Sequence, residues 1–159
     1  MKLSTQEEYG LRLLLQMARH EDKSLTLSDL SRQEGLSQPN VAKIMRILRK
    51  AGFARSTRGQ AGGYTLARPA FEVRVNEVLW AMGERLYDAT FCDRHAGEHA
   101  SCTHTGDCSI RPVLIQVQLA IDQVLGKLTL GQLVCSEIEM RSRAGARAIM
   151  LPLVEIRTS

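Results

Sequence analysis

Residues 26–52 contain two consecutive helix patterns joined by a very short turn, and this feature limits the possible folds more than any other. Thr26 can cap a short helix that ends at Gly35, a typical C-terminal stop. Ser37 can cap a second helix, which is expected to end at Gly52. Two helices joined by a tight turn around Gly35 predict a helix-turn-helix unit.

The second of these helices has one apolar face and one cationic face. At about 100° per residue, Val41, Ile44 and Leu48 share a face that can pack on a core. Amide side chains near the start of such a helix can pair with adenine edges in the major groove. A solvated amphipathic helix would show the same pattern, so the segment that follows decides between the two interpretations. The residues expected to contact DNA are Ser37, Gln38, Pro39, Asn40, Lys43, Arg46 and Lys50.

Two short β-prone segments, 53–55 and 64–66, flank a glycine-rich loop and predict a hairpin with a basic tip. Arg58 and Gly59 at the tip, and Tyr64 at the start of the second strand, are expected at the DNA. Glycine lets the backbone approach phosphates, and arginine can read the width of the minor groove. A phosphate-binding nucleotide loop is the competing interpretation, but its Gly-Lys-Ser/Thr ending and following helix are missing. A wing beside the helix-turn-helix therefore favours DNA binding.

The charge distribution agrees with a DNA-binding first half. Residues 1–75 contain 13 Lys and Arg against 7 Asp and Glu, whereas residues 76–159 contain 8 against 10. The 159 residues, 44% of them apolar, can form one domain and an oligomerisation element. The sequence has no signal-peptide pattern and no long apolar run, which predicts a cytoplasmic protein without a membrane partner.

Three of the four cysteines and three of the four histidines lie within residues 92–108. The spacing is Cys92-x9-Cys102-x5-Cys108, in a segment without apolar periodicity, which is typical of a ligand-bearing loop. In a reducing compartment such cysteines more often bind metal or act in redox chemistry than form structural disulfides. Thiolates suit iron–sulfur clusters and zinc alike, although zinc sites usually pair cysteines about two to four residues apart. An enzymatic role would need a positioned base, and the chain carries no catalytic motif.

Residues 110–128 predict a long helix with an apolar seam. Its apolar positions alternate in steps of four and three, as in paired helices, and we expect this seam to form a homodimer. An ordinary helix packed on its own domain is the alternative, because Val113, Leu119 and Leu125 add apolar surface. The seam consists of Ile110, Leu114, Val117, Ile121, Val124 and Leu128.

Several segments resemble the Rrf2 family of bacterial regulators over about residues 1–135. They are MKLSTQEEYGLRLLLQMA, LSDLSRQEGLSQPNVAKIMRILRKAGF, RGQAGGYTLARPA, and the cysteine loop with the helix after it. The resemblance implies a homodimeric winged helix-turn-helix protein. In many members three loop cysteines hold an iron–sulfur cluster, and Cys92, Cys102 and Cys108 match them here, for either a [2Fe–2S] or a [4Fe–4S] cluster.

The fourth cluster ligand differs between branches of this family. In the IscR branch a histidine three residues after the last cysteine serves, but that position is Arg111 here. In the NsrR and RsrR branches a carboxylate on the first helix of the partner subunit can serve, and the matching residue is Glu8. We therefore expect Glu8 of the partner subunit, with His104, His99 and His95 as alternatives. The first cysteine interval is also longer than in IscR, so the spacing assigns no branch.

These patterns predict a mainly α-helical fold with a small β-wing. A winged helix-turn-helix domain is expected over residues 1–75, a cluster-binding loop and dimerisation helix over 76–135, and a C-terminal tail over 136–159. The expected function is regulation of transcription, with affinity for double-stranded operator DNA controlled by a cluster that senses redox state, nitric oxide or iron–sulfur status. We expect no small-molecule substrate and no enzymatic activity. A zinc- or thiol-based repressor without an iron–sulfur cluster is the alternative.

Overall fold

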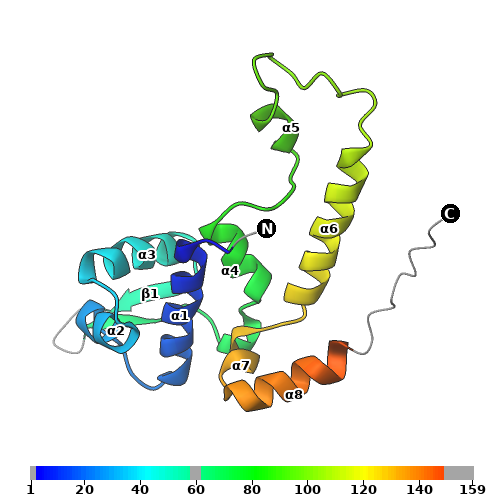
Figure 1. Cartoon of the computed structure of the whole chain (residues 1–159). Coiled ribbons are helices and arrows are strands. Elements are labelled where there is room, and N and C mark those ends of the chain that lie inside the picture. Colours follow the sequence, from blue (N-terminus) through cyan, green and yellow to red (C-terminus); the bar gives the residue numbers. More distant parts are fainter. Residues whose placement is uncertain (1–2, 58–61, 149–159) are drawn as a thin grey trace.

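In the computed structural model a helical body carries a long arm, formed by residues 83–109 (Figure 1). The structure describes residues 3–57 and 62–148, the last five of these by backbone only. The predicted mainly helical fold with a two-stranded wing is confirmed. The elements are α1 (Thr5–Arg19), α2 (Leu27–Glu34), α3 (Gln38–Lys50), β1 (Ala54–Thr57), β2 (Gly63–Leu66), a 3-10 turn (Ala70–Glu72), α4 (Val75–Met82), α5 (Phe91–Arg94), α6 (Ile110–Leu125), α7 (Leu130–Leu133) and α8 (Glu137–Ala148).

Helices α1 and α2 both begin at capping boxes. The Ser4 hydroxyl accepts from the Glu7 N–H at 3.2 Å, and the Glu7 carboxylate accepts from the Ser4 N–H at 2.7 Å. Thr26 and Asp29 form the same reciprocal pair at α2. Gly35 ends α2 with φ +65°, a left-handed conformation that glycine adopts without strain. The predicted start and stop of α2 are therefore confirmed.

Helix α3 begins where predicted, but Ser37 does not cap it through its side chain. Its backbone is extended, as an N-cap requires, yet its hydroxyl makes no capping hydrogen bond to the described residues. Pro39 lies in the first turn, where its lack of an N–H removes one donor that a cap would satisfy. Ser37 is exposed, so its hydroxyl faces outward at the start of the helix.

The core of the body lies where α1 packs against α2, α3 and α4. Val41, Ile44 and Leu48, the predicted apolar face of α3, are at most 1% exposed. Burying each such side chain is worth about 1.5–3 kcal/mol, so this face fixes the rotation of α3 about its axis. The opposite, cationic face must then point to solvent.

Glu34 joins α1 to the turn of the helix-turn-helix. Its carboxylate is only 8% exposed and accepts hydrogen bonds from Arg12 Nε and Gln16 Nε2, both at 2.6 Å. Arg12 Nη2 also donates to the backbone carbonyl of Glu34 at 2.8 Å. These bonds satisfy a buried carboxylate and one of the last carbonyls of α2, and they hold α2 against α1.

The wing is an antiparallel hairpin attached to the body by its second strand. The Tyr64 N–H donates to the Leu25 carbonyl at 2.8 Å, and the Leu25 N–H donates to the Tyr64 carbonyl at 3.0 Å. At Gly63 a Cβ atom would stand 2.7 Å from the Leu25 carbonyl oxygen, so this close approach requires glycine. Arg58 and Gly59, predicted at the wing tip, lie outside the described residues.

Helix α6 ends earlier than the sequence pattern predicts. It stops at Leu125, followed by Gly126 as C-cap, so Leu128 does not continue the seam. The Leu128 carbonyl accepts instead from the Val75 N–H at 3.0 Å, at the start of α4. The four-and-three spacing continues by one apolar position, Leu128, three residues past the helix end, because periodicity does not mark where a glycine terminates a helix.

Residues 136–159 were expected to form a tail; the structure places α8 over Glu137–Ala148, and residues 149–159 lie outside the described residues. The Ser136 N–H donates to the Glu139 carboxylate at 2.8 Å, and the Ser136 hydroxyl accepts from the Glu139 N–H at 3.2 Å, which is a capping box. Arg141 pairs with Glu137 one turn away at 2.7 Å. Local polar contacts therefore stabilise this helix, which the sequence does not predict because it has no apolar stripe.

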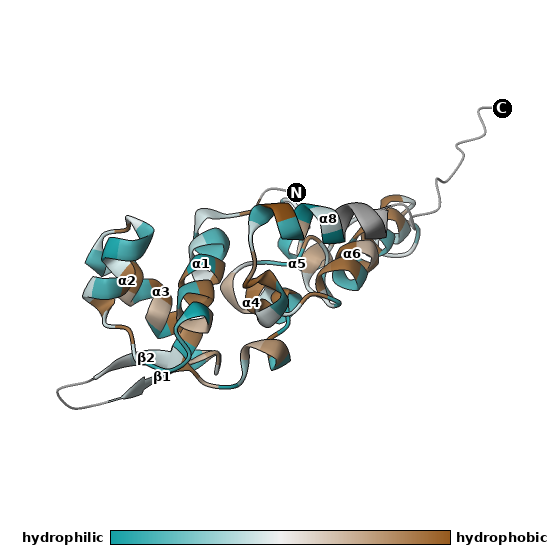
Figure 2. Ribbon diagram, turned by 90° about the horizontal axis from the view of Figure 1, so that it is seen from below, coloured by the Kyte–Doolittle hydropathy of each residue, from teal (hydrophilic) through white to brown (hydrophobic). Residues whose placement is uncertain are grey.

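Helix α6 exposes its apolar face and turns a polar side toward its own chain. Ile110, Val113, Val117 and Val124 are between 42% and 64% exposed, and α6 is largely hydrophobic in Figure 2. Gln118, on the other side of the helix, is only 6% exposed. A helix that packs only within its own chain would bury the apolar side, so this apolar face is available to a partner.

Candidate DNA-binding surface and cysteine cavity

The cationic face of α3 is exposed in the body. Lys43, Arg46 and Lys50 are exposed. At the start of the helix Ser37, Gln38 and Pro39 are also exposed, while Asn40 is half-buried. These side chains lie on the surface that the sequence analysis predicts to face the DNA. The contact of each side chain with DNA stays a prediction.

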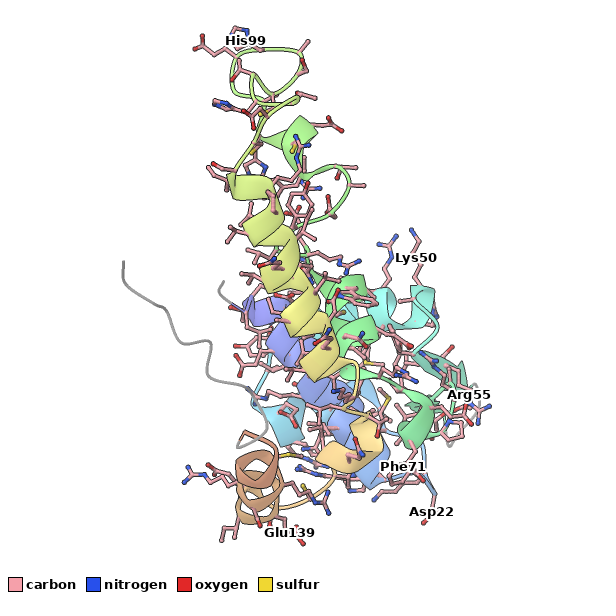
Figure 3. All side chains as sticks on the ribbon, turned by 90° about the vertical axis from the view of Figure 1, so that its right-hand side faces the viewer. Asp22, Lys50, Arg55, Phe71, His99 and Glu139 are labelled. Carbon is pink, nitrogen blue, oxygen red and sulfur yellow. The ribbon has the colours of Figure 1, made fainter. Side chains whose placement is uncertain are left out.

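Two exposed arginines that were not predicted extend this surface. Arg49 lies in the last turn of α3 and Arg55 on β1, where its Nε donates to Thr65 Oγ1 at 3.1 Å. Figure 3 shows Lys50 and Arg55 projecting from the same side of the molecule. The two-residue period of a strand could have identified Arg55, because the preceding Ala54 is buried.

Tyr64, predicted at the DNA, also has a structural role. Its side chain is half-buried and packs against the hydrophobic core, while its backbone forms both hydrogen bonds to Leu25. Tyr64 therefore anchors the wing to the body. Its contact with DNA stays a prediction.

The three loop cysteines line one cavity of about 160 Å³ between α5 and the start of α6. Cys92 comes from α5, Cys102 from the loop, and Cys108 from just before α6. All three are half-buried free thiols. Within the described residues, no three His, Cys, Asp or Glu side chains are grouped closely enough to hold a metal ion as they stand. The other lining residues are Tyr87, Phe91, His95, His104, Ile110, Arg111 and Leu114.

Two polar side chains of this cavity show the effect of burial. Arg111 Nε is buried and has no hydrogen-bond partner among the described residues, although Nη2 donates to the Thr105 carbonyl at 3.1 Å. Burial raises the pKa of Tyr87, and its hydrogen bond with Cys92 raises it further. A buried, unpaired donor on a cation is costly. The cavity is therefore suited to an anionic group that can accept from Arg111.

The candidate fourth ligands lie in different places. His95 and His104 line the cavity with the cysteines, whereas His99 does not and lies at the far tip of the arm (Figure 3). Glu8 lies on α1 in the body, where its side chain is 54% exposed and its carboxylate is 3.5 Å from Arg12 Nη1. Within one chain the structure brings two histidines, but not Glu8, to the cysteine cavity.

A chain of polar contacts connects the cavity to the body. The N–H of Tyr87 donates to the Gln118 side chain at 3.2 Å, and the Gln118 amide donates to the Asp122 carboxylate at 2.7 Å. Arg85 forms an ion pair with Asp122, and its guanidinium lies 4.5 Å from the centre of the Trp80 ring on α4. Because α4 packs on α1 and α3, this network joins the arm to the helices of the DNA-binding body.

A winged helix-turn-helix body with an exposed cationic helix, joined to a cysteine-bearing arm, defines a DNA-binding regulator of transcription. None of the helices in the described part of the chain is long and apolar enough to cross a membrane. The chain belongs to the Rrf2 family, whose sequence profile, described as iron-dependent transcriptional regulator, matches residues 3–136. This is a family of regulators, and the chain is not an enzyme.

Named relatives show the same family relationship, and a solved structure shows the same fold. The chain is 34% identical to protein rrf2 of Nitratidesulfovibrio vulgaris over 84% of its length and 87% of that protein. It is 32% identical to the HTH-type transcriptional regulator IscR of Vibrio vulnificus, over 84% of its length and 77% of the relative. Its fold matches that of CymR, the global cysteine regulator of B. subtilis, with a TM-score of 0.68 at 22% identity, covering 84% of this chain and 96% of CymR.

Proposed function

We propose that this regulator binds operator DNA with an affinity that depends on an iron–sulfur cluster held by Cys92, Cys102 and Cys108. The observation that carries the proposal is that all three thiols line one cavity, although 16 positions separate Cys92 from Cys108. The relative from Vibrio vulnificus, the transcriptional regulator IscR, belongs to the same family. Redox state, nitric oxide or iron–sulfur status is the proposed signal.

The residues around the cavity fit such a group. Three thiolates are its preferred donors, and either a [2Fe–2S] or a [4Fe–4S] core is compatible with three cysteine ligands and one further ligand. When bound, the cluster would supply a redox-active iron centre. Arg111 Nε offers a hydrogen bond to an anionic sulfur, and Phe91, Ile110 and Leu114 contribute apolar surface to the lining of the cavity.

We further propose that the regulator is a homodimer paired through α6. Ile110, Leu114, Val117, Ile121 and Val124 lie on one side of this helix, and three of them are exposed. A second copy related by a two-fold axis would cover this face with the same face of its own. Val117→Glu is expected to shift the protein to monomer in analytical ultracentrifugation, whereas Gln116→Glu, on the exposed side away from the seam, should leave the dimer intact.

The polar contacts between the cavity and the body supply the means of control. Tyr87 belongs to the cavity, and Gln118 and Asp122 connect its backbone to α6 and Arg85. A rearrangement of the arm would therefore change the position of α6 relative to α4 and the recognition helices. Half-sites are read only when two recognition helices stand about 34 Å apart, so a small rotation lowers operator affinity. A coupling free energy of roughly 1–3 kcal/mol changes affinity about 5- to 150-fold.

A thiol- or zinc-based repressor is the second candidate. It is favoured by one observation: the three thiols are free and share a cavity without being grouped for coordination in the described structure. In this case Cys92, Cys102 and Cys108 would form disulfides or bind zinc, and Glu8 would have no role at the site.

The first experiment is an anaerobic absorption spectrum of the purified protein, with iron, acid-labile sulfide and zinc counted per chain. We expect visible bands with matching iron and sulfide. They should be lost in Cys92→Ala, Cys102→Ala and Cys108→Ala but kept in Cys135→Ala, which removes the fourth cysteine, a free thiol that does not line the cavity. Operator affinity should differ between the cluster-loaded and apo forms of the same preparation. A colourless protein, even after anaerobic reconstitution, would refute the cluster and favour the thiol or zinc switch.

A further inference from the structure

We propose that His95 is the fourth protein ligand of the cluster, through its Nε2 atom, in place of Glu8 of the partner subunit. This inference rests on the proposed iron–sulfur function. It assigns the ligand from the contacts of the arm itself.

The first argument is position. Cys92, the second residue of α5, and His95, its C-cap, are three residues apart, a spacing that places two side chains on the same face of a helical turn. Both side chains line the cavity that contains Cys102 and Cys108. A single turn of helix therefore presents a thiol and an imidazole to the same space.

The second argument is the orientation of the imidazole ring. His95 Nδ1 lies 2.8 Å from the Phe91 carbonyl oxygen. A carbonyl only accepts, so this contact places a proton on Nδ1, and a ring that carries this single proton keeps its lone pair on Nε2. The ring also stacks on Phe91, with centroids 4.1 Å apart and planes 20° apart. Metal-binding histidines are typically oriented in this way, by donating the other ring N–H to a carbonyl or carboxylate.

The other candidates lack this combination. His99 does not line the cavity, and Glu8 is on α1, beside Arg12. His104 lines the cavity and is exposed, as is His95, but no hydrogen bond within the described structure orients its ring. His95 is the candidate that is both at the cavity and held with a free ring nitrogen.

Charge also favours a neutral ligand. Three thiolates and a neutral imidazole around a core of charge 2+ leave a net charge of about −1, whereas a carboxylate would leave about −2. Arg111 is the single arginine or lysine among the residues that line the described cavity. One cation thus balances the cluster that carries the histidine.

The test is pulsed EPR of the reduced, reconstituted homodimer with ¹⁵N-labelled histidine, on the wild-type protein and on His95→Ala, His104→Ala, Glu8→Ala and the matched control His99→Ala. Iron and sulfide are counted in each sample. The wild type should show the strong nitrogen coupling of a coordinated imidazole. The coupling should disappear in His95→Ala and stay in the other three variants.

If His95→Ala retains no cluster, His95→Cys provides the second variant. It should restore iron and sulfide to the wild-type ratio without nitrogen coupling, and its reduction potential should be more negative because a thiolate replaces a neutral ligand. Nitrogen coupling that survives in His95→Ala and is lost in His104→Ala would overturn the assignment. The assignment would also be overturned if the wild-type cluster showed no nitrogen coupling and the cluster itself were lost in Glu8→Ala. That result would leave the proposed function intact. A wild-type protein that binds no cluster would refute both.

Discussion

Replacing Glu34 with alanine should destabilise the body far more than removing the other carboxylate beside Arg12. The Glu34 carboxylate is 8% exposed and accepts two hydrogen bonds at 2.6 Å, from Arg12 and Gln16. A hydrogen bond to a charged group contributes about 1.5–3 kcal/mol. Arg12 is 38% exposed and can recover water, so we reduce the combined effect to about 2 kcal/mol. For a chain of this size, this lowers the melting temperature by about 4–8 °C.

The matched control is Glu8→Ala. Glu8 faces the same arginine at 3.5 Å but is 54% exposed, so its loss should cost at most about 0.5 kcal/mol. Both variants are compared with wild type by urea denaturation of the apo protein at one protomer concentration, because dimerisation shifts apparent stability. Equal losses in the two variants would show that burial of Glu34 does not determine the strength of its contacts.

Three further outcomes are expected. In a fluorescence titration, Lys43→Ala should weaken operator binding. If Lys43 neutralises one phosphate, the substitution should also reduce the magnitude of the slope of log affinity against log salt by about 0.9. The control Lys127→Ala should change neither the affinity nor the slope. Gly63→Ala should displace the wing, because the new Cβ would stand 2.7 Å from a backbone carbonyl oxygen. Operator affinity should fall while the total helix content, measured by circular dichroism, is unchanged. Thr26→Ala should raise the pKa of Asp29 toward its ordinary value of 3.8, since the Thr26 hydrogen bonds lower it. Asp29 stabilises the folded wild type above about pH 3.8, and this stability is lost as the pH falls through the lower pKa of the folded state. In the variant, NMR titration should therefore give a smaller lowering of the Asp29 pKa, and acid unfolding should show a smaller loss of stability from this group.

The body could be predicted from sequence because its signals are local. The caps of α2, the glycine at its end and the spacing of Val41, Ile44 and Leu48 each act within a few residues, and the structure shows them as expected. The wing also follows from a local pattern of β-prone segments around glycine. Its attachment to Leu25 does not, because that pairing joins residues distant in sequence.

The arm was less predictable, because its arrangement depends on tertiary contacts. The sequence identified Cys92, Cys102 and Cys108 as a set, but it could not separate His95 from His104 and His99. That distinction depends on the hydrogen bond of His95 to Phe91 and on the shape of the cavity. Helix α8 was missed because it carries few apolar residues to signal a helix.

The arm also has very little hydrophobic support of its own. Between Gly83 and Ser109, a segment that the structure describes in full, every residue is half-buried or exposed. Such a segment opens at a small free-energy cost, so coordination of the proposed cluster and local folding of the arm would become one equilibrium. The apparent affinity for the cluster is then the intrinsic affinity multiplied by the fraction of arms already in the competent shape. Any substitution that loosens the arm would therefore have the effect that we expect from a lack of iron: it would empty the proposed cluster site while every proposed ligand is still present.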